Sequence, residues 1–246
     1  MLLAWIIAFS VLGSIGAIVG AALLLLFKEP TRKVLLPCLL SYAIGTLLGA
    51  AFLGMIPNAL AQETALAISG TVLAGIVIFF FLEKIIIWRH CHNAECEVHG
   101  TAGPLILIGD AFHNFVDGFV MAAAFLTSVP LGIAASLAVI AHEIPQEVGD
   151  FAILLDNGYS KRRALALNLL SSLTTLPGAV IAYFFLGATR EVVPFILALS
   201  AASFIYIAIA DLVPSLHRKA GLKPAICQLC LILAGIGTIA VFRLVH

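Results

Sequence analysis

Two nearby stretches of an apolar chain carry side chains that can bind a metal ion. The first reads HNFVDG, from His113 to Gly118, and the second reads HEIPQEVGD, from His142 to Asp150. With Asp110 they hold five of the chain's 13 acidic residues and two of its seven histidines. Imidazole, carboxylate and amide groups suit zinc or iron(II) better than calcium or magnesium. We therefore predict that the two stretches form a divalent-metal site.

The spacing of these residues places them on two helix faces that can meet. Residues three or four positions apart share one face of a helix. The residues spaced in this way are Asp110, His113 and Asp117 in the first stretch, and His142 with Gln146 and Glu143 with Glu147 in the second. Asn114 lies beside His113, and Asp150 follows Glu147 within one further turn. At a rise of about 1.5 Å per residue, His113 and His142 come to overlapping depths near the centre of a membrane.

A structural polar network that only joins two helices is the alternative interpretation. Ionisable groups inside membrane-spanning segments are unfavourable and mark functional sites by default. Five acids and two histidines in two consecutive helices favour an ion site over a structural network. We interpret Asp110, Glu147 and Asp150 as an acidic route that leads from the site toward the inner side of the membrane.

Composition supports the membrane location on which this interpretation depends. The chain of 246 residues is 62% hydrophobic and 11% charged, with a mean hydropathy of +1.15, whereas a soluble domain is about 25% charged. Apolar runs of about 20 residues can cross a bilayer. Eight such runs lie at approximately 3–26, 34–58, 66–88, 104–128, 131–155, 163–186, 192–215 and 224–245. We expect an all-α, multi-pass membrane protein with a single transmembrane domain over residues 1–246. The net charge of zero gives no basic face for nucleic acid.

The basic residues indicate how these helices are oriented. If the N-terminus is outside, the cytoplasmic loops and helix ends hold 11 of the 13 basic residues, and only Arg190 and Arg243 remain outside. The positive-inside rule then places both termini outside. The first three and the last three helices start on opposite sides of the membrane, as they do in an inverted-repeat transporter.

The sixth run is more polar than its neighbours. It carries Asn168, Ser171, Ser172, Thr174 and Thr175. Since lipid offers these groups no hydrogen-bond partner, we expect them to bond to neighbouring helices.

Three residues outside the central pair are candidates for the ion pathway. His90 and His92 begin an inner loop, about 89–103, that is rich in histidine and cysteine. This loop either collects metal or is only a solvated segment. Asp211, near the inner end of the seventh run, belongs either to an exit path or to the membrane interface.

The paired motifs resemble those of the ZIP family of divalent metal transporters, in the subfamily whose fifth helix reads HExPHE. The resemblance extends to GTLLGAAFLGMIPNA in the second run, LEK…WRHCH at the end of the third and FIYIAIADLVP in the seventh. It therefore covers most of the chain. It implies eight helices in a 3+2+3 arrangement, metal movement toward the cytoplasm, an elevator-like motion of the central helices against the rest, and a homodimer.

The resemblance also implies a set of ligands. A first site would use His113, Asp117, His142 and Gln146, and a neighbouring second site would use Asn114, Asp117 and Glu143, with Glu147 as a further candidate. Asp117 would bridge the two sites. Gln146 stands where the family motif has a second histidine, and this neutral, weaker ligand is expected to alter metal preference or rate.

The sequence therefore predicts a transporter, not an enzyme, that moves a divalent transition metal into the cytoplasm between the fourth and fifth helices. Zinc is the first candidate, followed by iron, manganese and cadmium, and we expect no prosthetic group. An intramembrane zinc-dependent hydrolase is the alternative, because HEIPQ is an incomplete HExxH motif in which Glu143 would act as base. A metal-binding sensor that does not transport is the third. The compact size favours a prokaryotic inner membrane.

Overall fold

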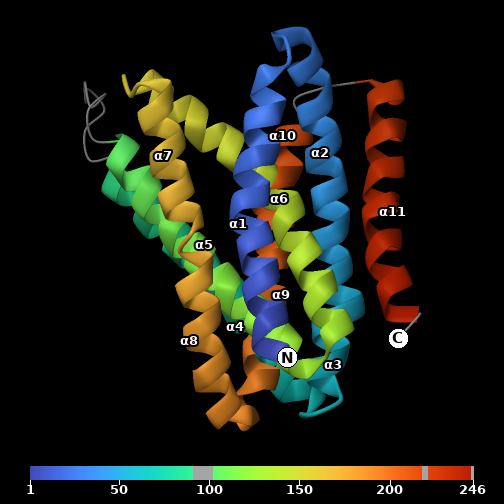
Figure 1. Ribbon diagram of the computed structural model, residues 1–246. Helices are drawn as coiled ribbons and strands as arrows, with labels where there is room; N and C mark the ends of the chain where they lie inside the picture. The colour runs from blue at the N-terminus through green and yellow to red at the C-terminus, as the bar shows by residue number, and fades with distance from the viewer. Residues whose placement is uncertain (91–101, 218–220, 245–246) are drawn as a thin grey trace.

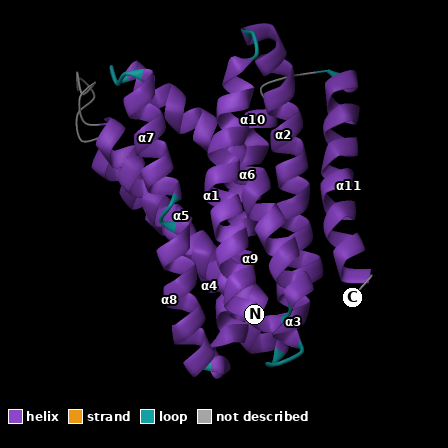
Figure 2. Ribbon diagram, in the orientation of Figure 1, coloured by secondary structure: helices purple, strands orange, loops and turns teal. Residues whose placement is uncertain are grey.

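The chain forms a bundle of eight helical spans in a computed structural model that describes residues 1–90, 102–217 and 221–244 (Figure 1). Helices and short connections make up these ranges, and no strand occurs in them (Figure 2). In chain order the elements are α1 (Leu2–Leu26), α2 (Glu29–Gly49), η1 (Ala50–Met55), α3 (Ile56–Leu60), α4 (Ala65–His90), α5 (Ala102–Thr127), α6 (Val129–Asp156), α7 (Lys161–Ser172), α8 (Thr175–Ala188), η2 (Arg190–Val192), α9 (Val193–Tyr206), η3 (Ile207–Leu212), α10 (Val213–His217) and α11 (Leu222–Leu244). The predicted all-α fold with eight spans is confirmed.

Three of the spans are built from more than one element. The second span joins α2, η1 and α3, the sixth joins α7 and α8, and the seventh joins η2, α9, η3 and α10. Successive spans alternate in direction, so the start of α1 and the end of α11 lie at the same end of the bundle (Figure 1). The connections from α1 to α2 and from α6 to α7, which are flanked by basic residues, lie at the opposite end. That this basic end faces the cytoplasm stays a prediction.

Large apolar side chains cover the outside of the bundle. Leu12, Leu66, Phe81 and Leu170 are 52%, 84%, 62% and 65% exposed. Broad exposed apolar surfaces of this kind mark contact with a membrane, whose acyl chains solvate them. The chain is therefore an integral, multi-pass membrane protein.

Two spans change from α-helix to π-helix beside a proline. The π-helical segment η1 directly precedes α3, which contains Pro57, and the π-helical segment η3 directly precedes α10, which contains Pro214. Proline has no N–H to donate to the carbonyl four residues earlier, and a π turn is one way for a helix to continue past it. Because the second and seventh spans run in opposite directions, the bundle contains the same local structure twice, in inverted orientation.

Glycines let the fourth and sixth spans pack backbone against backbone. A Cβ atom on Gly118 of α5 would collide with Thr175 O and Ala179 N of α8. A Cβ atom on Gly178 of α8 would collide with the backbone of Phe115 on α5. Close approach of this kind is how small residues join helices within a membrane. It fixes α5 against α8 at the level of the HNFVDG motif.

Replacing Gly118 with alanine tests this close approach. Alanine is more favourable than glycine inside a helix by about 1 kcal/mol, so at an uncrowded position the change raises stability or leaves it unaltered. At Gly118 the added methyl group meets backbone atoms, and we expect a loss of about 1–3 kcal/mol and a lower Tm of the protein in detergent micelles.

Gly70→Ala on α4 is the matched control, because a Cβ there meets no described atom within 4 Å. A Tm for Gly118→Ala equal to or above that of Gly70→Ala would contradict the proposed packing of α5 against α8.

Candidate metal centre

The two motifs lie level with each other halfway along α5 and α6, which pack side by side. A single residue, Ser128, connects the helices, and its hydroxyl accepts a hydrogen bond from the Leu131 N–H at 3.3 Å. His113 lies 15 residues before Ser128 and His142 lies 14 residues after it. Since the helices are antiparallel, these nearly equal separations from the turn place the two imidazoles at about the same depth.

Four side chains converge at this depth, and we call them the histidine group: His113, Asp117, His142 and Glu143. The Nε2 atoms of His113 and His142 lie 3.2 Å apart. Asp117 Oδ2 lies 3.7 Å from the first of these atoms and 3.4 Å from the second, and Glu143 Oε1 lies 3.4 and 3.6 Å from them. Donors at about 2.1 Å from a tetrahedral zinc ion stand about 3.4 Å from one another. The group therefore has the spacing of ligands around one such ion.

The carboxylates of the histidine group are buried without a hydrogen-bond partner in the described part of the chain, and the two imidazoles are their ion-pair partners when protonated. Asp117 is 0% exposed and Glu143 is 1% exposed, and their oxygen atoms accept no hydrogen bond within the described part of the chain. A buried carboxylate without a partner is unfavourable by several kcal/mol, and a bound cation supplies the missing interaction. The His113 side chain, at 23% exposure, is the most accessible member of the group.

His142 is held with one ring nitrogen turned toward the group. Its Nδ1 lies 3.0 Å from the carbonyl oxygen of Ala138, one helical turn earlier. A carbonyl only accepts, so Nδ1 carries the proton, and Nε2, which faces His113 Nε2 at 3.2 Å, is the nitrogen whose lone pair can bind a cation. A backbone carbonyl on the distal nitrogen is the usual way to orient a metal-binding histidine. The ring also packs edge-on against Phe204 of α9, with centroids 6.1 Å apart.

Glu143 also belongs to a second cluster, which we call the carboxylate group: Asp110, Glu143 and Glu147. One oxygen from each residue lies within 4.8 Å of the others. The sequence places Asp110 on the acidic route and Glu147 at the second site, and the structure brings both against Glu143. In this arrangement Glu143, not Asp117, is the residue common to both clusters.

The two amide residues contact Asp110. Gln146 Nε2 donates to Asp110 Oδ1 at 3.1 Å, and Asn114 Nδ2 donates to the same atom at 3.0 Å. The resemblance implies a ligand role for each amide, in the first site for Gln146 and in the second for Asn114. The geometry instead joins both amides to the carboxylate group. Asp110 and Gln146 each lie 18 residues from Ser128, so their separation from the turn indicates that they lie at the same depth but not that their side chains meet.

The sixth span supports the carboxylate group through hydrogen bonds. Thr175 Oγ1 donates to Asn114 Oδ1 at 3.0 Å, and Asn168 Nδ2 donates to the backbone carbonyl of Glu147 at 3.2 Å. The expectation that polar residues of this span bond to neighbouring helices is confirmed.

Of the remaining pathway candidates, the Asp150 side chain lies within the described part of the chain, and it belongs to neither cluster. Asp150 is half-buried on α6, between Glu147 and the end of the helix at Asp156. The side chains of His90 and Asp211 and the whole of His92 lie outside the described residues, as does most of the loop 89–103.

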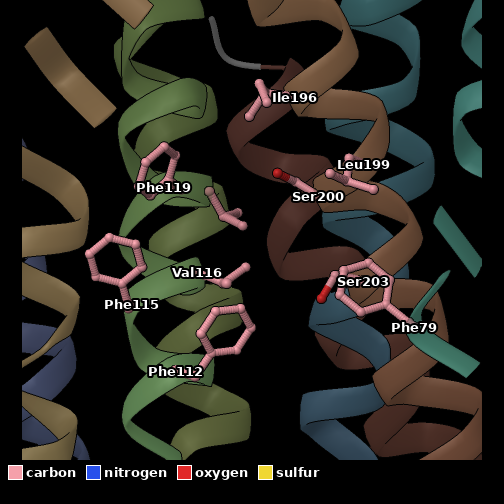
Figure 3. A pocket seen from close by; sticks show the side chains of 10 residues that line it. Phe79, Phe112, Phe115, Val116, Phe119, Ile196, Leu199, Ser200 and Ser203 are labelled. Atoms are coloured by element: carbon pink, nitrogen blue, oxygen red, sulfur yellow. The ribbon is translucent and has the colours of Figure 1, made fainter. Parts of the chain in front are cut away.

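A separate apolar cavity lies on the other side of α5, between α5, α9 and α4 (Figure 3). Its volume is about 250 Å³, and aromatic and aliphatic side chains line it, among them Phe79, Phe112, Phe119 and Leu199. Two hydroxyls, from Ser200 and Ser203, are its polar lining groups. It offers no imidazole or carboxylate among the described residues and is not a metal site.

Comparison with known proteins decides the family. Residues 88–243 match the family described as ZIP Zinc transporter. Zinc transporter ZIP13 of Pongo abelii is 34% identical over 221 residues, which cover 84% of this chain and 66% of that protein. A Drosophila melanogaster Zinc transporter ZIP13 homolog is 30% identical, covering 89% of this chain and 80% of the relative. Human Zinc transporter ZIP4 is 44% identical over 120 residues, which are 49% of this chain and 18% of that protein.

The chain belongs to the ZIP zinc transporter family. ZIP proteins are transporters, which agrees with the expectation that the chain is not an enzyme and does not favour the hydrolase alternative. The ZIP relatives named here are animal proteins and lend no support to the expected prokaryotic membrane.

Zinc binding to the purified protein tests the histidine group of this ZIP family member. We expect His142→Ala and Asp117→Asn each to weaken zinc affinity by more than about tenfold. Removal of a residue that only hydrogen-bonds to a metal ligand already weakens affinity by about 10–100-fold, and removal of a ligand itself should weaken it at least as much. Competition with a chromophoric chelator in detergent measures the change.

Glu63→Gln, in the connection between α3 and α4, is the control and should bind zinc as the wild type does. Zinc affinity that survives both changes in the histidine group would mean that the ion binds elsewhere.

Proposed function

We propose that the protein carries a divalent transition-metal ion, zinc in the first place, through the membrane by way of the histidine group. The supporting observation is the convergence of two imidazoles and two unpartnered, buried carboxylates at one depth between α5 and α6. A group of this kind inside an apolar bundle is stable with a cation present. The relatives compared above are all named as zinc transporters, which agrees with this proposal.

The ligand chemistry favours zinc but admits related ions. Two nitrogen and two oxygen donors suit the tetrahedral geometry of zinc, and imidazole also suits iron(II). Cysteine contributes to neither cluster in the described ranges. An ion that must leave again is better served by these ligands than by thiolates, because conduction requires binding that is weak enough for release.

The distribution of charge supports movement toward the cytoplasm. The positive-inside rule assigns the basic end of the bundle to that side. From the histidine group, Asp110, Glu147 and Asp150 follow one another along α5 and α6 toward the same end. An ion that leaves the histidine group meets acidic oxygens in this direction.

The pairing of the spans supports alternating access. In one set, α5 packs along α8 and α6, and α6 packs along α1. In the other set, α2 packs along α11 and α4 packs along α9. We propose that the first set moves as a rigid body against the second, which we call the stationary set, in the elevator-like manner that the resemblance implies. The apolar cavity of Figure 3 lies on the boundary between the two sets, at α5 and α9. The inverted π segments of the second and seventh spans lie in the stationary set. Homodimerisation stays a prediction.

Transport itself can be measured in liposomes. We expect the wild-type protein to admit zinc, and His113→Ala and Glu143→Gln to lower uptake to the level of protein-free vesicles, because each removes a donor from the histidine group. Parallel measurements with iron(II) and manganese give the selectivity.

Glu191→Gln, an exposed position in η2, is the control and should transport zinc normally. Robust wild-type uptake that persists in both His113→Ala and Glu143→Gln would refute the assignment of the site. The absence of any wild-type uptake would refute the function.

Relative motion can be tested by a cross-link across the apolar cavity. Val116 of α5 and Ser203 of α9 both line it. In a background without the native cysteines, we expect a cleavable bifunctional thiol reagent to stop zinc uptake by Val116→Cys/Ser203→Cys, and reduction of the linker to restore it.

The control links Tyr42→Cys on α2 to Thr238→Cys on α11. The native side chains of these residues form a 3.1 Å hydrogen bond within the stationary set. Uptake should survive this second link. Equal inhibition by both links, or by neither, would contradict the proposed boundary.

A further inference from the structure

The apolar cavity between α5, α9 and α4 is continuous with the surface that faces the lipid (Figure 3). Phe112 lines the cavity and is 62% exposed, and Ile108, four residues before it on α5, is 66% exposed. Phe115 and Phe119 continue the lining along α5 and are half-buried. In a multi-pass membrane protein, exposed apolar side chains of this kind contact acyl chains. The cavity is therefore open to the hydrocarbon of the bilayer.

Hydrocarbon suits this cavity better than water does. Its volume is about 250 Å³, whereas an apolar cavity of about 150 Å³ already stays dry and binds benzene. Ser200 and Ser203 are its polar lining groups, and both lie on α9, so the lining side chains of α5 and α4 offer water no hydrogen-bond partner. An empty cavity would leave its lining without van der Waals contacts, at a cost that increases with its volume. A hydrocarbon chain restores these contacts.

The cavity and the histidine group occupy the same two turns of α5. Phe112 lines the cavity, and the next residue, His113, belongs to the histidine group. Val116 lines the cavity, and the next residue, Asp117, belongs to the histidine group as well. In Figure 3 the side chains of Phe112 and Val116 point from α5 toward α9. Any change in the position of α5 at the cavity therefore also moves two candidate metal ligands.

The same relation holds on the side of α9. Ser203 lines the cavity, and the next residue, Phe204, packs edge-on against His142 with ring centroids 6.1 Å apart. Whatever fills the cavity thus lies one residue away from contacts of the histidine group on both helices.

We propose that the cavity binds an acyl chain of a membrane phospholipid, and that this chain regulates the movement of α5 past α9. The regulation rests on the proposed function, since α5 belongs to the set that moves and α9 to the stationary set. An unbranched chain with many rotatable bonds adapts to irregular gaps. It can therefore fill the space between two helices and still yield when one slides past the other, whereas a rigid side chain in the same place would hold them together.

Photolabelling in liposomes tests the binding of lipid. The full-length protein is reconstituted with a phosphatidylcholine that carries a diazirine midway along one acyl chain, and the labelled residues are identified by mass spectrometry after irradiation. We expect label on Val116 and Leu199, two half-buried residues of the cavity lining. Phe81, which is 62% exposed on α4, reports contact with the bulk lipid and should be labelled as well. Label on Phe81 without label on the cavity residues would overturn the lipid site.

Variants that fill the cavity sharpen this test. Ser200→Phe places a rigid ring in the cavity and should abolish the label on the cavity residues, while Phe81 stays labelled. Ser203→Leu adds a smaller apolar group to the same wall and serves as the second variant if Ser200→Phe does not fold. Ser69→Phe, on the exposed surface of α4, is the matched control and should be labelled as the wild type is. Cavity label that survives both Ser200→Phe and Ser203→Leu would overturn the lipid site.

Zinc uptake by the same liposomes tests the regulation. Overpacking by a rigid group raises the barrier to movement at the boundary, so we expect Ser200→Phe to slow uptake by about tenfold or more. Zinc affinity in detergent should remain that of the wild type, because the histidine group is intact. Uptake by Ser200→Phe as fast as uptake by Ser69→Phe would overturn the regulation.

The outcomes distinguish this inference from the proposed function. A wild-type protein that takes up zinc while its cavity residues stay unlabelled overturns the lipid site and leaves transport intact. A wild-type protein that is labelled in the cavity but moves no zinc overturns transport and leaves the lipid site intact. Unaltered size-exclusion profiles of the variants exclude misfolding as the cause of a loss.

Discussion

Buried acids without hydrogen-bond partners are the constraint on which the rest of this structure depends. Asp117, Glu143 and Glu147 are at most 1% exposed, and none of their side-chain oxygens is satisfied within the described ranges. Ions isolated in a medium of low dielectric constant are unfavourable by many kcal/mol unless an opposite charge lies beside them. The two imidazoles of the histidine group supply such a charge when protonated, and a cation bound among these side chains would supply it in their place.

The surrounding helices hold this arrangement in place. The one-residue turn at Ser128 sets the register of α5 against α6, and Gly118 and Gly178 bring α8 onto the back of α5. From there a chain of hydrogen bonds runs from Thr175 through Asn114 to Asp110. Rigid support of this kind fixes metal ligands in geometry that loops would not maintain. The candidate ligands therefore lie on helices that a tight turn, backbone contacts and hydrogen bonds hold in place.

Much of this organisation can be predicted from the sequence, because it follows from local rules. A bilayer requires long apolar runs, and these give the eight spans. Intervals of three and four residues place Asp110, His113 and Asp117 on one face of a helix. Nearly equal separations from a short turn give the depth of His113 and His142.

The side-chain partners could not be predicted in the same way. Gln146 lies four residues from His142, so helical spacing alone makes it a candidate ligand of the histidine group. Its contact with Asp110 depends on the rotamer it adopts between two packed helices, which a linear pattern does not encode. The π-helical segments η1 and η3 also depend on how each helix compensates for the backbone N–H that Pro57 and Pro214 lack. At the break between α7 and α8, Thr174 donates to Ala111 O on α5 and Ser172 O accepts from Ser14 on α1, and these partners are far away in the sequence.

Anomalous X-ray diffraction from zinc-soaked crystals, recorded at the zinc absorption edge, tests the central claim most directly. The account predicts an anomalous peak between α5 and α6, about 2.0–2.1 Å from the Nε2 atoms of His113 and His142, with Asp117 and Glu143 completing the coordination. A zinc peak elsewhere in the bundle, with the space between these four side chains empty, would contradict it.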